Sequence, residues 1–135
     1  MTTLKGSFEV ASWDEIPYDE RDSRRLTRAS VTQRFSGAVS GEGSAEWLMS
    51  YNEDATARFV GLQLVDGEIA GRRGTFVLET HGEFDGSAAR WEATVVPGSP
   101  RGDLKGISGH GSFEAPLGST AKFSLEVELG SADGA

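Results

Sequence analysis

The stretch KFSLEVEL, residues 122–129, alternates polar and apolar side chains without interruption. Successive side chains of a β-strand point to opposite faces, so a period of two predicts a half-buried strand with one apolar face. No window of the chain shows the sustained i, i+3, i+4, i+7 spacing of an amphipathic helix. The pattern therefore predicts an all-β protein.

The same alternation returns along the rest of the chain. It predicts eight strands, over residues 4–10, 28–35, 44–51, 56–65, 69–83, 89–96, 104–114 and 122–129. Asp-Gly pairs at 66–67 and 85–86 favour tight hairpin turns, because glycine accepts a positive φ. Residues 97–102 and 116–118 are expected to form further connections, and the charged segment 14–25 a surface loop. Short turns between successive strands describe an antiparallel meander.

Glycine is unusually frequent, at 18 of 135 residues, and many of the glycines fall inside the predicted strands. Glycine within a strand permits bends, bulges and close approaches of the backbone. A meander of this size also has exposed edges unless it closes on itself. We therefore predict one domain over residues 1–130, an eight-stranded antiparallel barrel of lipocalin size, with 131–135 as a frayed tail; a two-sheet sandwich is the alternative.

Composition excludes several classes of function. The chain has 13 basic and 21 acidic residues and a net charge of −8, which argues against binding nucleic acid or an anionic membrane surface. It has no cysteine, and its two histidines, His81 and His110, have no third ligand at a recognisable spacing. No phosphate-binding loop or hydrolase motif is present, so we expect no metal and no cofactor. The absence of an apolar leader favours a cytoplasmic protein.

Three segments resemble a known family. They are GEGSAEWLMSY (41–51), ATARFVGLQLVDGEIAGRRGTFVLETHGEF (55–84) and VVPGSPRGDLKGISGHGSFE (95–114). Together they are similar to a bacterial family of unknown function that is grouped with the allene oxide cyclase barrels. The resemblance implies an antiparallel β-barrel but no established activity. It also implies a histidine at the position of Thr80, whereas the histidine here, His81, is the next residue and faces the other way.

Polar side chains on otherwise apolar strand faces are the candidate site residues. Burying such a group without a hydrogen bond costs about 1–3 kcal/mol, so it is retained for structure or for a ligand. Aromatic and methionine side chains beside a few polar groups are typical of a small-molecule pocket. We expect the ligand-binding residues to be Gln33, Trp47, Met49, Tyr51, Arg72 and Trp91. Candidates for proton transfer are Glu79, His81 and Tyr51.

The expected function is binding of an apolar small molecule inside the barrel. One form of it is a cyclase or isomerase that acts on a polyketide- or lipid-like substrate by confinement and hydrogen bonding, by analogy with the allene oxide cyclases. The alternatives are a non-catalytic binding barrel and an oligomeric structural barrel. A homo-oligomer is indicated by Val60, Leu62 and Leu64, which share one strand face while Phe59 and Val65 share the other.

The first predicted strand carries a second aromatic residue beyond its apolar part. Trp13 shares the parity of Lys5, Ser7 and Glu9, so it is expected on a solvated face. The acidic residues that follow it, Glu15 among them, are expected to form a solvated surface that keeps the protein soluble.

Overall fold

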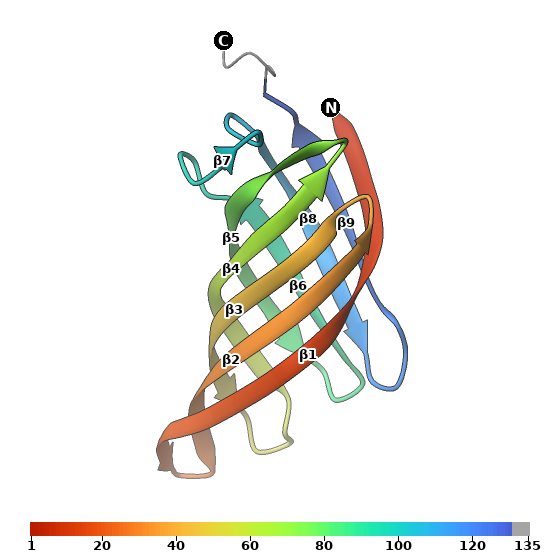
Figure 1. Ribbon diagram of the computed structural model, residues 1–135. Helices are drawn as coiled ribbons and strands as arrows, with labels where there is room; N and C mark the ends of the chain where they lie inside the picture. The colour runs from red at the N-terminus through yellow and green to blue at the C-terminus, as the bar shows by residue number, and fades with distance from the viewer. Residues whose placement is uncertain (131–135) are drawn as a thin grey trace.

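The computed structural model describes residues 1–130, which form nine β-strands and no helix (Figure 1). The tail expected at 131–135 lies outside the described residues. The strands are β1 (Thr2–Arg21), β2 (Arg24–Gly37), β3 (Ser40–Tyr51), β4 (Ala57–Ile69), β5 (Arg72–Phe84), β6 (Ala88–Val95), β7 (Arg101–Gly102), β8 (Ser108–Pro116) and β9 (Ala121–Glu128).

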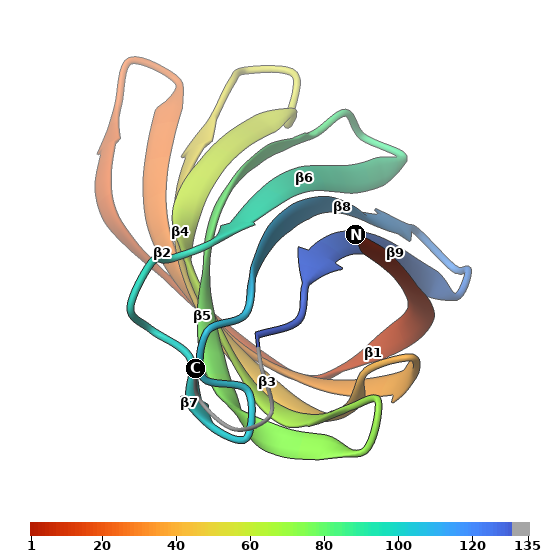
Figure 2. The same ribbon diagram turned by 90° about the horizontal axis from the view of Figure 1, so that it is seen from above.

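Eight of these strands close into an antiparallel barrel. From β1 to β6 each strand pairs with the next, β6 pairs with β8, β8 with β9, and β9 returns to β1. The short β7 adds to β5 outside this cycle. Viewed from above, the strands form a ring (Figure 2). The predicted barrel is confirmed, and the sandwich alternative is wrong because every strand belongs to one continuous sheet.

The upper half of the barrel is filled with apolar side chains. The connection from β6 to β8 lies at the upper end of Figure 1, and its Leu104 and Ile107, 2% and 4% exposed, belong to the hydrophobic core. Below them lies an aromatic cluster whose neighbouring ring centroids are 5.1 to 6.5 Å apart, made of Phe8, Phe35, Trp47, Phe59, Trp91, Phe113 and Phe123. Edge-to-face and offset aromatic contacts of this length stabilise a core beyond the area they bury.

Gly61 shows why the barrel wall needs glycine. It pairs with Trp47 across β3 and β4. A Cβ atom at position 61 would lie 2.7 Å from Trp47 Cδ1 and closer still to the carbonyl oxygen of Glu46. Glycine therefore lets the two strands approach while the Trp47 indole packs across them.

The segment 14–25 is not a loop, so that prediction is wrong. β1 continues past its pairing with β9 and stays paired with β2, which itself pairs with β3 as far as Arg25. We call this extension of β1 and β2 the arm; it is visible at the lower left of Figure 1 and turns at Asp22 and Ser23, which both have positive φ (52° and 62°). Charged residues are compatible with this ladder because most of their side chains are exposed to solvent, and Glu20 faces Arg25 across it at 3.9 Å.

The hairpin turn expected at Asp66-Gly67 is also misplaced. Both residues lie within β4, and the chain turns instead at Ala70 and Gly71, whose φ angles are 53° and 79°. Gly67 lets β4 approach β3 closely, since a Cβ at this position would lie 2.5 Å from the Ser40 carbonyl oxygen. The turn expected at Asp85-Gly86 is confirmed, and the Asp85 carboxylate accepts hydrogen bonds from the following backbone N–H groups.

Candidate functional site

A cavity of about 280 Å³ occupies the lower half of the barrel, at the end from which the arm projects. We call it the chamber. Most of its lining is apolar, and it reaches from the aromatic cluster to the lower rim. Its lining residues are Phe8, Val10, Trp13, Gln33, Trp47, Met49, Tyr51, Phe59, Phe84, Ala89, Trp91, Ala115 and Leu117. Val10, Trp13 and Leu117 form its mouth, and they are 47%, 47% and 66% exposed.

A β-bulge in β1 shapes the mouth. Val10 pairs with Gln33 and Ser12 with Thr32, so Ala11 has no partner in the ladder. An unpaired extra residue shifts the alternation by one, so even-numbered residues of β1 face inward before Ala11 and odd-numbered residues face inward directly after it. Beyond the bulge Trp13 pairs with Val31 and Glu15 with Ala29, two inward positions. The expectation that Trp13 lies on a fully solvated face is therefore wrong: its ring centroid lies 6.2 Å from that of Trp47.

Glu15 is held at the mouth by three hydrogen bonds. Its Oε2 accepts from Thr27 Oγ1 at 2.6 Å and from the Tyr51 hydroxyl at 2.7 Å, and its Oε1 accepts from Trp13 Nε1 at 2.9 Å. Partial burial acts to raise the pKa of this carboxyl, but the three hydrogen bonds and the charge of Arg25 outweigh it and hold the pKa below 4.5. Glu15 is therefore an ionised, fully engaged carboxylate at neutral pH.

Tyr51 links this carboxylate to the chamber wall. Its burial, its hydrogen bond to Glu15 and the charge of Glu15 raise the pKa of the phenol to about 12. The Arg25 guanidinium carbon lies 5.7 Å from the centroid of the Tyr51 ring. Tyr51 thus remains a neutral phenol whose proton points to Glu15, while the hydroxyl oxygen is able to accept a hydrogen bond.

A chain of hydrogen bonds crosses the deep end of the chamber. Trp91 Nε1 donates to Gln63 Oε1 at 3.4 Å, and Gln63 Nε2 donates to Gln33 Oε1 at 2.7 Å. The chain ends at Gln33 Nε2, which is buried and has no hydrogen-bond partner among the described residues. Buried polar atoms are nearly always paired, so an unpartnered amide in a cavity wall indicates a position for a ligand or water acceptor.

Comparison with protein families gives one match. The family described as "Protein of unknown function (DUF3224)" matches residues 4–127. The chain belongs to the DUF3224 family. This confirms the resemblance to a bacterial family of unknown function with a barrel fold.

A solved structure is similar to this DUF3224 barrel. It is the crystal structure of a protein with unknown function from the DUF3224 family of Shewanella oneidensis MR-1, with 24% sequence identity and a TM-score of 0.78. The match covers 97% of this chain and 99% of that chain. At this identity it shows the shared fold alone. Comparison with curated proteins gives no match.

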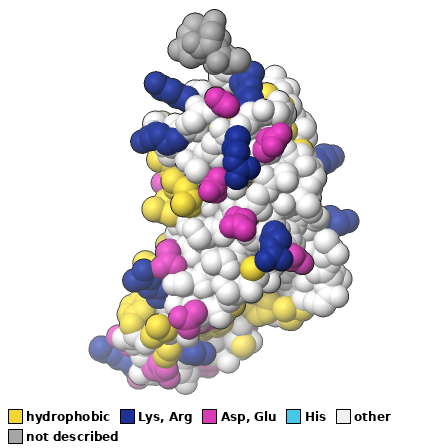
Figure 3. Space-filling model, in the orientation of Figure 1, with side chains coloured by type: hydrophobic (Ala, Val, Ile, Leu, Met, Phe, Trp, Pro, Cys, Tyr) yellow, Lys and Arg dark blue, Asp and Glu magenta, His cyan; other side chains and the backbone are white. Residues whose placement is uncertain are grey.

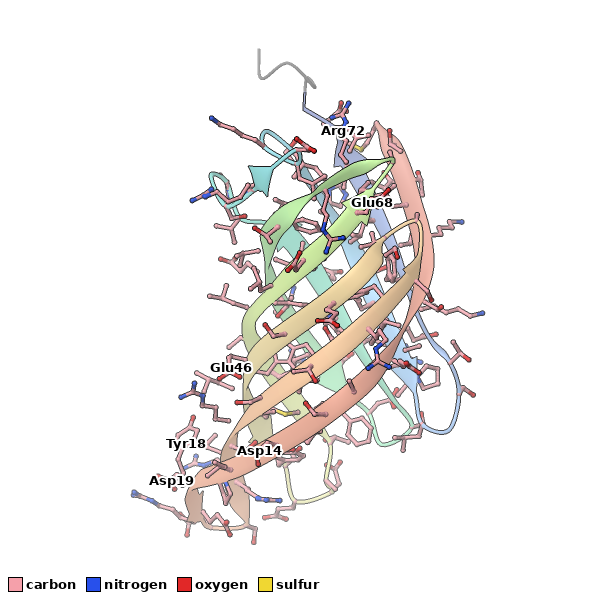
Figure 4. The ribbon with its side chains drawn as sticks, in the orientation of Figure 1. Asp14, Tyr18, Asp19, Glu46, Glu68 and Arg72 are labelled. Carbon is pink, nitrogen blue, oxygen red and sulfur yellow. The ribbon has the colours of Figure 1, made fainter. Side chains whose placement is uncertain are left out.

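The DUF3224 chamber contains five of the six residues expected to bind a ligand. Gln33, Trp47, Met49, Tyr51 and Trp91 all line it. The sixth, Arg72, lies at the opposite end of the barrel, where its Nη1 donates to the Gly130 carbonyl oxygen, and Figure 4 shows it far from Asp14 on the arm. The alternation of side chains along the strands was therefore enough to identify five of the residues that line the chamber.

Two of the three residues expected to transfer protons face away from the chamber. Glu79 and His81 are exposed on the outer surface of β5, and His81 Nε2 lies 3.4 Å from Glu92 Oε2. Thr80, between them, faces inward, is 2% exposed and accepts a hydrogen bond from Trp47 Nε1 at 2.9 Å. Only Tyr51 of the three lies at the chamber.

The residues that sequence reasoning missed are Trp13, Glu15 and Thr27. The spacing of two between Trp13 and Glu15 places both on one face, but only the bulge makes that face the inner one. Among residues 1–130, no group of three or more histidine, aspartate or glutamate side chains is placed to hold a metal ion. Within the same range the chain has no helix that could cross a membrane.

Proposed function

We propose that this protein binds a small, mainly apolar molecule in the chamber. The observation that carries the proposal is a cavity of about 280 Å³ with aromatic walls and one unpartnered amide, in a barrel whose other end is filled. A cavity of about 150 Å³ accepts benzene, and pockets for drug-sized ligands begin at about 300 Å³. The chamber therefore has the size for a compound of one or two rings.

The two ends of the barrel support a single route into the chamber. Buried Leu104 and Ile107 fill the upper end, whereas Val10, Trp13 and Leu117 expose apolar surface at the mouth. An apolar ligand that reaches the mouth loses contact with water before it passes Trp13, which the hydrophobic effect favours.

The chemistry of the chamber favours binding over catalysis. A cyclase or isomerase reaction would have to use Tyr51 and Glu15, since Glu79 and His81 lie on the outer surface. Both Glu15 oxygens already accept hydrogen bonds, and the pKa of Tyr51 near 12 makes it a weak acid. Confinement of a reactive substrate, with Tyr51 and Gln33 as hydrogen-bonding groups, is the form of catalysis that this arrangement supports.

Naphthalene is a suitable probe for binding, because Trp47 and Trp91 report on the chamber by fluorescence. We expect saturable quenching in the wild type. Ala115→Phe places a ring in the chamber and is expected to abolish the quenching, whereas Ser112→Phe, on the exposed face of the same strand, leaves it unchanged. Circular dichroism checks that both variants fold. Unsaturable quenching in the wild type, or equal quenching in Ala115→Phe, would contradict the proposal.

A second candidate role, as a homodimer, is favoured by the outer face of β4. Val60, Leu62 and Leu64 are 55%, 53% and 43% exposed there, and Figure 3 shows hydrophobic side chains along this side of the molecule. Arg58 and Asp66 lie on the same face at the two ends of this apolar stripe. A second copy packed antiparallel about Leu62 would place Arg58 against the partner's Asp66. Such a self-complementary pattern is what a two-fold interface requires.

The dimer is expected to be weak, because the convex wall turns away on both sides of β4 and limits the contact area. Sedimentation at rising concentration tests it. Arg58→Asp places like charges together and is expected to yield monomers, whereas Arg58→Asp combined with Asp66→Arg exchanges the charges and restores the dimer. A wild type that stays monomeric at millimolar concentration, or a double variant that stays monomeric, rules this role out.

A further inference from the structure

The hydrogen-bond chain at the deep end of the chamber has a fixed direction. The Trp91 indole can only donate, so the amide oxygen of Gln63 must face it. Gln63 then presents its Nε2 to Gln33 at 2.7 Å, which requires the oxygen of Gln33 at that position. The Gln33 amide is thereby oriented from behind, and Nε2 is the atom left over. Gln33 Nε2 therefore lacks an acceptor because the Trp91 indole fixes the orientation of Gln63, and Gln63 fixes that of Gln33.

The group that would complete this chain of hydrogen bonds is an acceptor for Gln33 Nε2. Gln33 is 2% exposed and lines the chamber, so the acceptor has to come from inside it. A carbonyl oxygen suits this position best, because it accepts without bringing a donor of its own that would also need a partner. A pure hydrocarbon would leave Nε2 unpaired.

The lining of the chamber offers no charge partner to an anionic acceptor, because the nearby Arg25 lies outside it, beside Tyr51 and Glu15. None of its lining residues is a lysine or an arginine. The ionised Glu15 lies beside the mouth, hydrogen-bonded to Tyr51 and Trp13, which both line the chamber. A carboxylate ligand would leave water, pass a like charge and find no cation inside, and burying a charge in that way is costly.

We propose that the chamber selects uncharged one- or two-ring compounds that carry a carbonyl group, such as a ketone, aldehyde, ester or lactone, whose oxygen accepts a hydrogen bond from Gln33 Nε2. This inference rests on the proposed binding function and names its ligand class. The rings lie against the aromatic walls, and the carbonyl oxygen is the one polar contact at the deep end. Gln33 is then a specificity-determining residue, and Gln63 and Trp91 position it.

Three probes of matched shape separate this inference from binding in general. They are 2-acetylnaphthalene, 2-isopropenylnaphthalene, which replaces the carbonyl oxygen with a methylene group, and 2-naphthoate, which carries a charge. Titration against tryptophan fluorescence is expected to give a dissociation constant about tenfold lower for the ketone than for the alkene, as one hydrogen bond to an otherwise unpaired donor predicts. The carboxylate is expected not to bind.

Two variants test whether the preference for the ketone over the alkene comes from Gln33. Gln33→Met, Gln63→Met and Trp91→Phe together remove the whole hydrogen-bond chain, including the Trp91 Nε1 donor that would otherwise lose its acceptor. This triple variant is expected to bind the ketone and the alkene equally, with Trp47 as the fluorescent reporter. Thr80→Ser changes a different interior polar side chain, outside the chamber lining, but keeps the hydroxyl that accepts from Trp47 Nε1, and should keep the tenfold preference. The infrared carbonyl band of the bound ketone should shift to lower frequency in the wild type and in Thr80→Ser but not in the triple variant.

The outcomes are distinguishable. If neither neutral probe binds the wild type, the proposed binding function fails. If both bind with equal affinity, or if the carboxylate binds most tightly, the chamber binds ligands but this ligand class is overturned. The comparison of the probes and the infrared band in the wild type decide between these outcomes even if the triple variant fails to fold.

Discussion

Replacing Gly61 with alanine is expected to lower the free energy of unfolding by about 3 kcal/mol, near the upper end of the usual cost of overpacking. The added Cβ would lie 2.7 Å from Trp47 Cδ1 and 2.9 Å from the carbonyl carbon of Glu46, with the Glu46 oxygen closer still. Two of these three atoms are backbone, so relief requires β3 and β4 to separate. Their separation would break the ladder beside the indole that packs in the aromatic cluster.

Urea unfolding followed by circular dichroism measures this loss. Gly71→Ala is the matched control, because a Cβ there meets no atom within 4 Å and the change costs only the positive φ of 79°, about 1 to 2 kcal/mol. Equal midpoints for Gly61→Ala and the wild type would show that the close strand approach does not contribute to stability.

Neutralising Glu15 is expected to lower the pKa of Tyr51 from about 12 toward its ordinary value of 10.0. Glu15→Gln removes the charge and keeps a hydrogen-bond acceptor of the same size, so burial and the remaining hydrogen bond continue to raise the pKa of Tyr51, but by less. An ultraviolet titration of tyrosinate follows the change, and Tyr51→Phe assigns the signal. Asp14→Asn removes the same charge from the neighbouring residue, which points outward, and should leave the Tyr51 titration in place.

The free energy of unfolding should depend on Tyr51 at high pH and on Glu15 at low pH. The pKa of Tyr51 is raised in the fold, so its contribution is complete below pH 10 and is lost as the pH rises toward 12. The pKa of Glu15 is lowered, so its contribution is present above pH 4.5 and is lost as the pH falls through the folded value. The difference in melting temperature between wild type and Glu15→Gln should therefore shrink in acid. A difference independent of pH, or an unchanged Tyr51 titration, would contradict the coupling.

The alternation of side chains predicted the barrel because nearly every strand buries one face. Residues 122–129 show this most clearly, and Phe123, Leu125 and Val127 are all buried in the core. The arm escaped prediction because both of its faces are largely solvated, so its sequence has no apolar parity to detect. Its strands are held by backbone pairing and cross-strand charges, which the order of residues along one strand does not show.

The alternation of side chains along the strands predicted the part of the candidate site that lies on clearly apolar strand faces. Gln33, Trp47, Met49, Tyr51 and Trp91 share inward faces with apolar neighbours, and all of them line the chamber. Parity could not decide which face of β5 points inward, so Glu79 and His81 were grouped with the site although they lie outside. Trp13 and Glu15 could not be found from parity, because the bulge at Ala11 shifts the alternation of residues 12–17, before a second register shift between Pro17 and Asp19.

The bulge at Ala11 decides how relatives of different strand length should be aligned at the mouth. Without that one residue Ser12 would follow Val10 directly, and Trp13 and Glu15 would keep their partners Val31 and Ala29 on the inner face. A one-residue insertion or deletion at this point of β1 is thus absorbed locally, so members of one family can differ there in length while the same side chains face the mouth. Relatives are best compared at the mouth by strand register, since an alignment that closes the gap at Ala11 would pair residues from opposite faces.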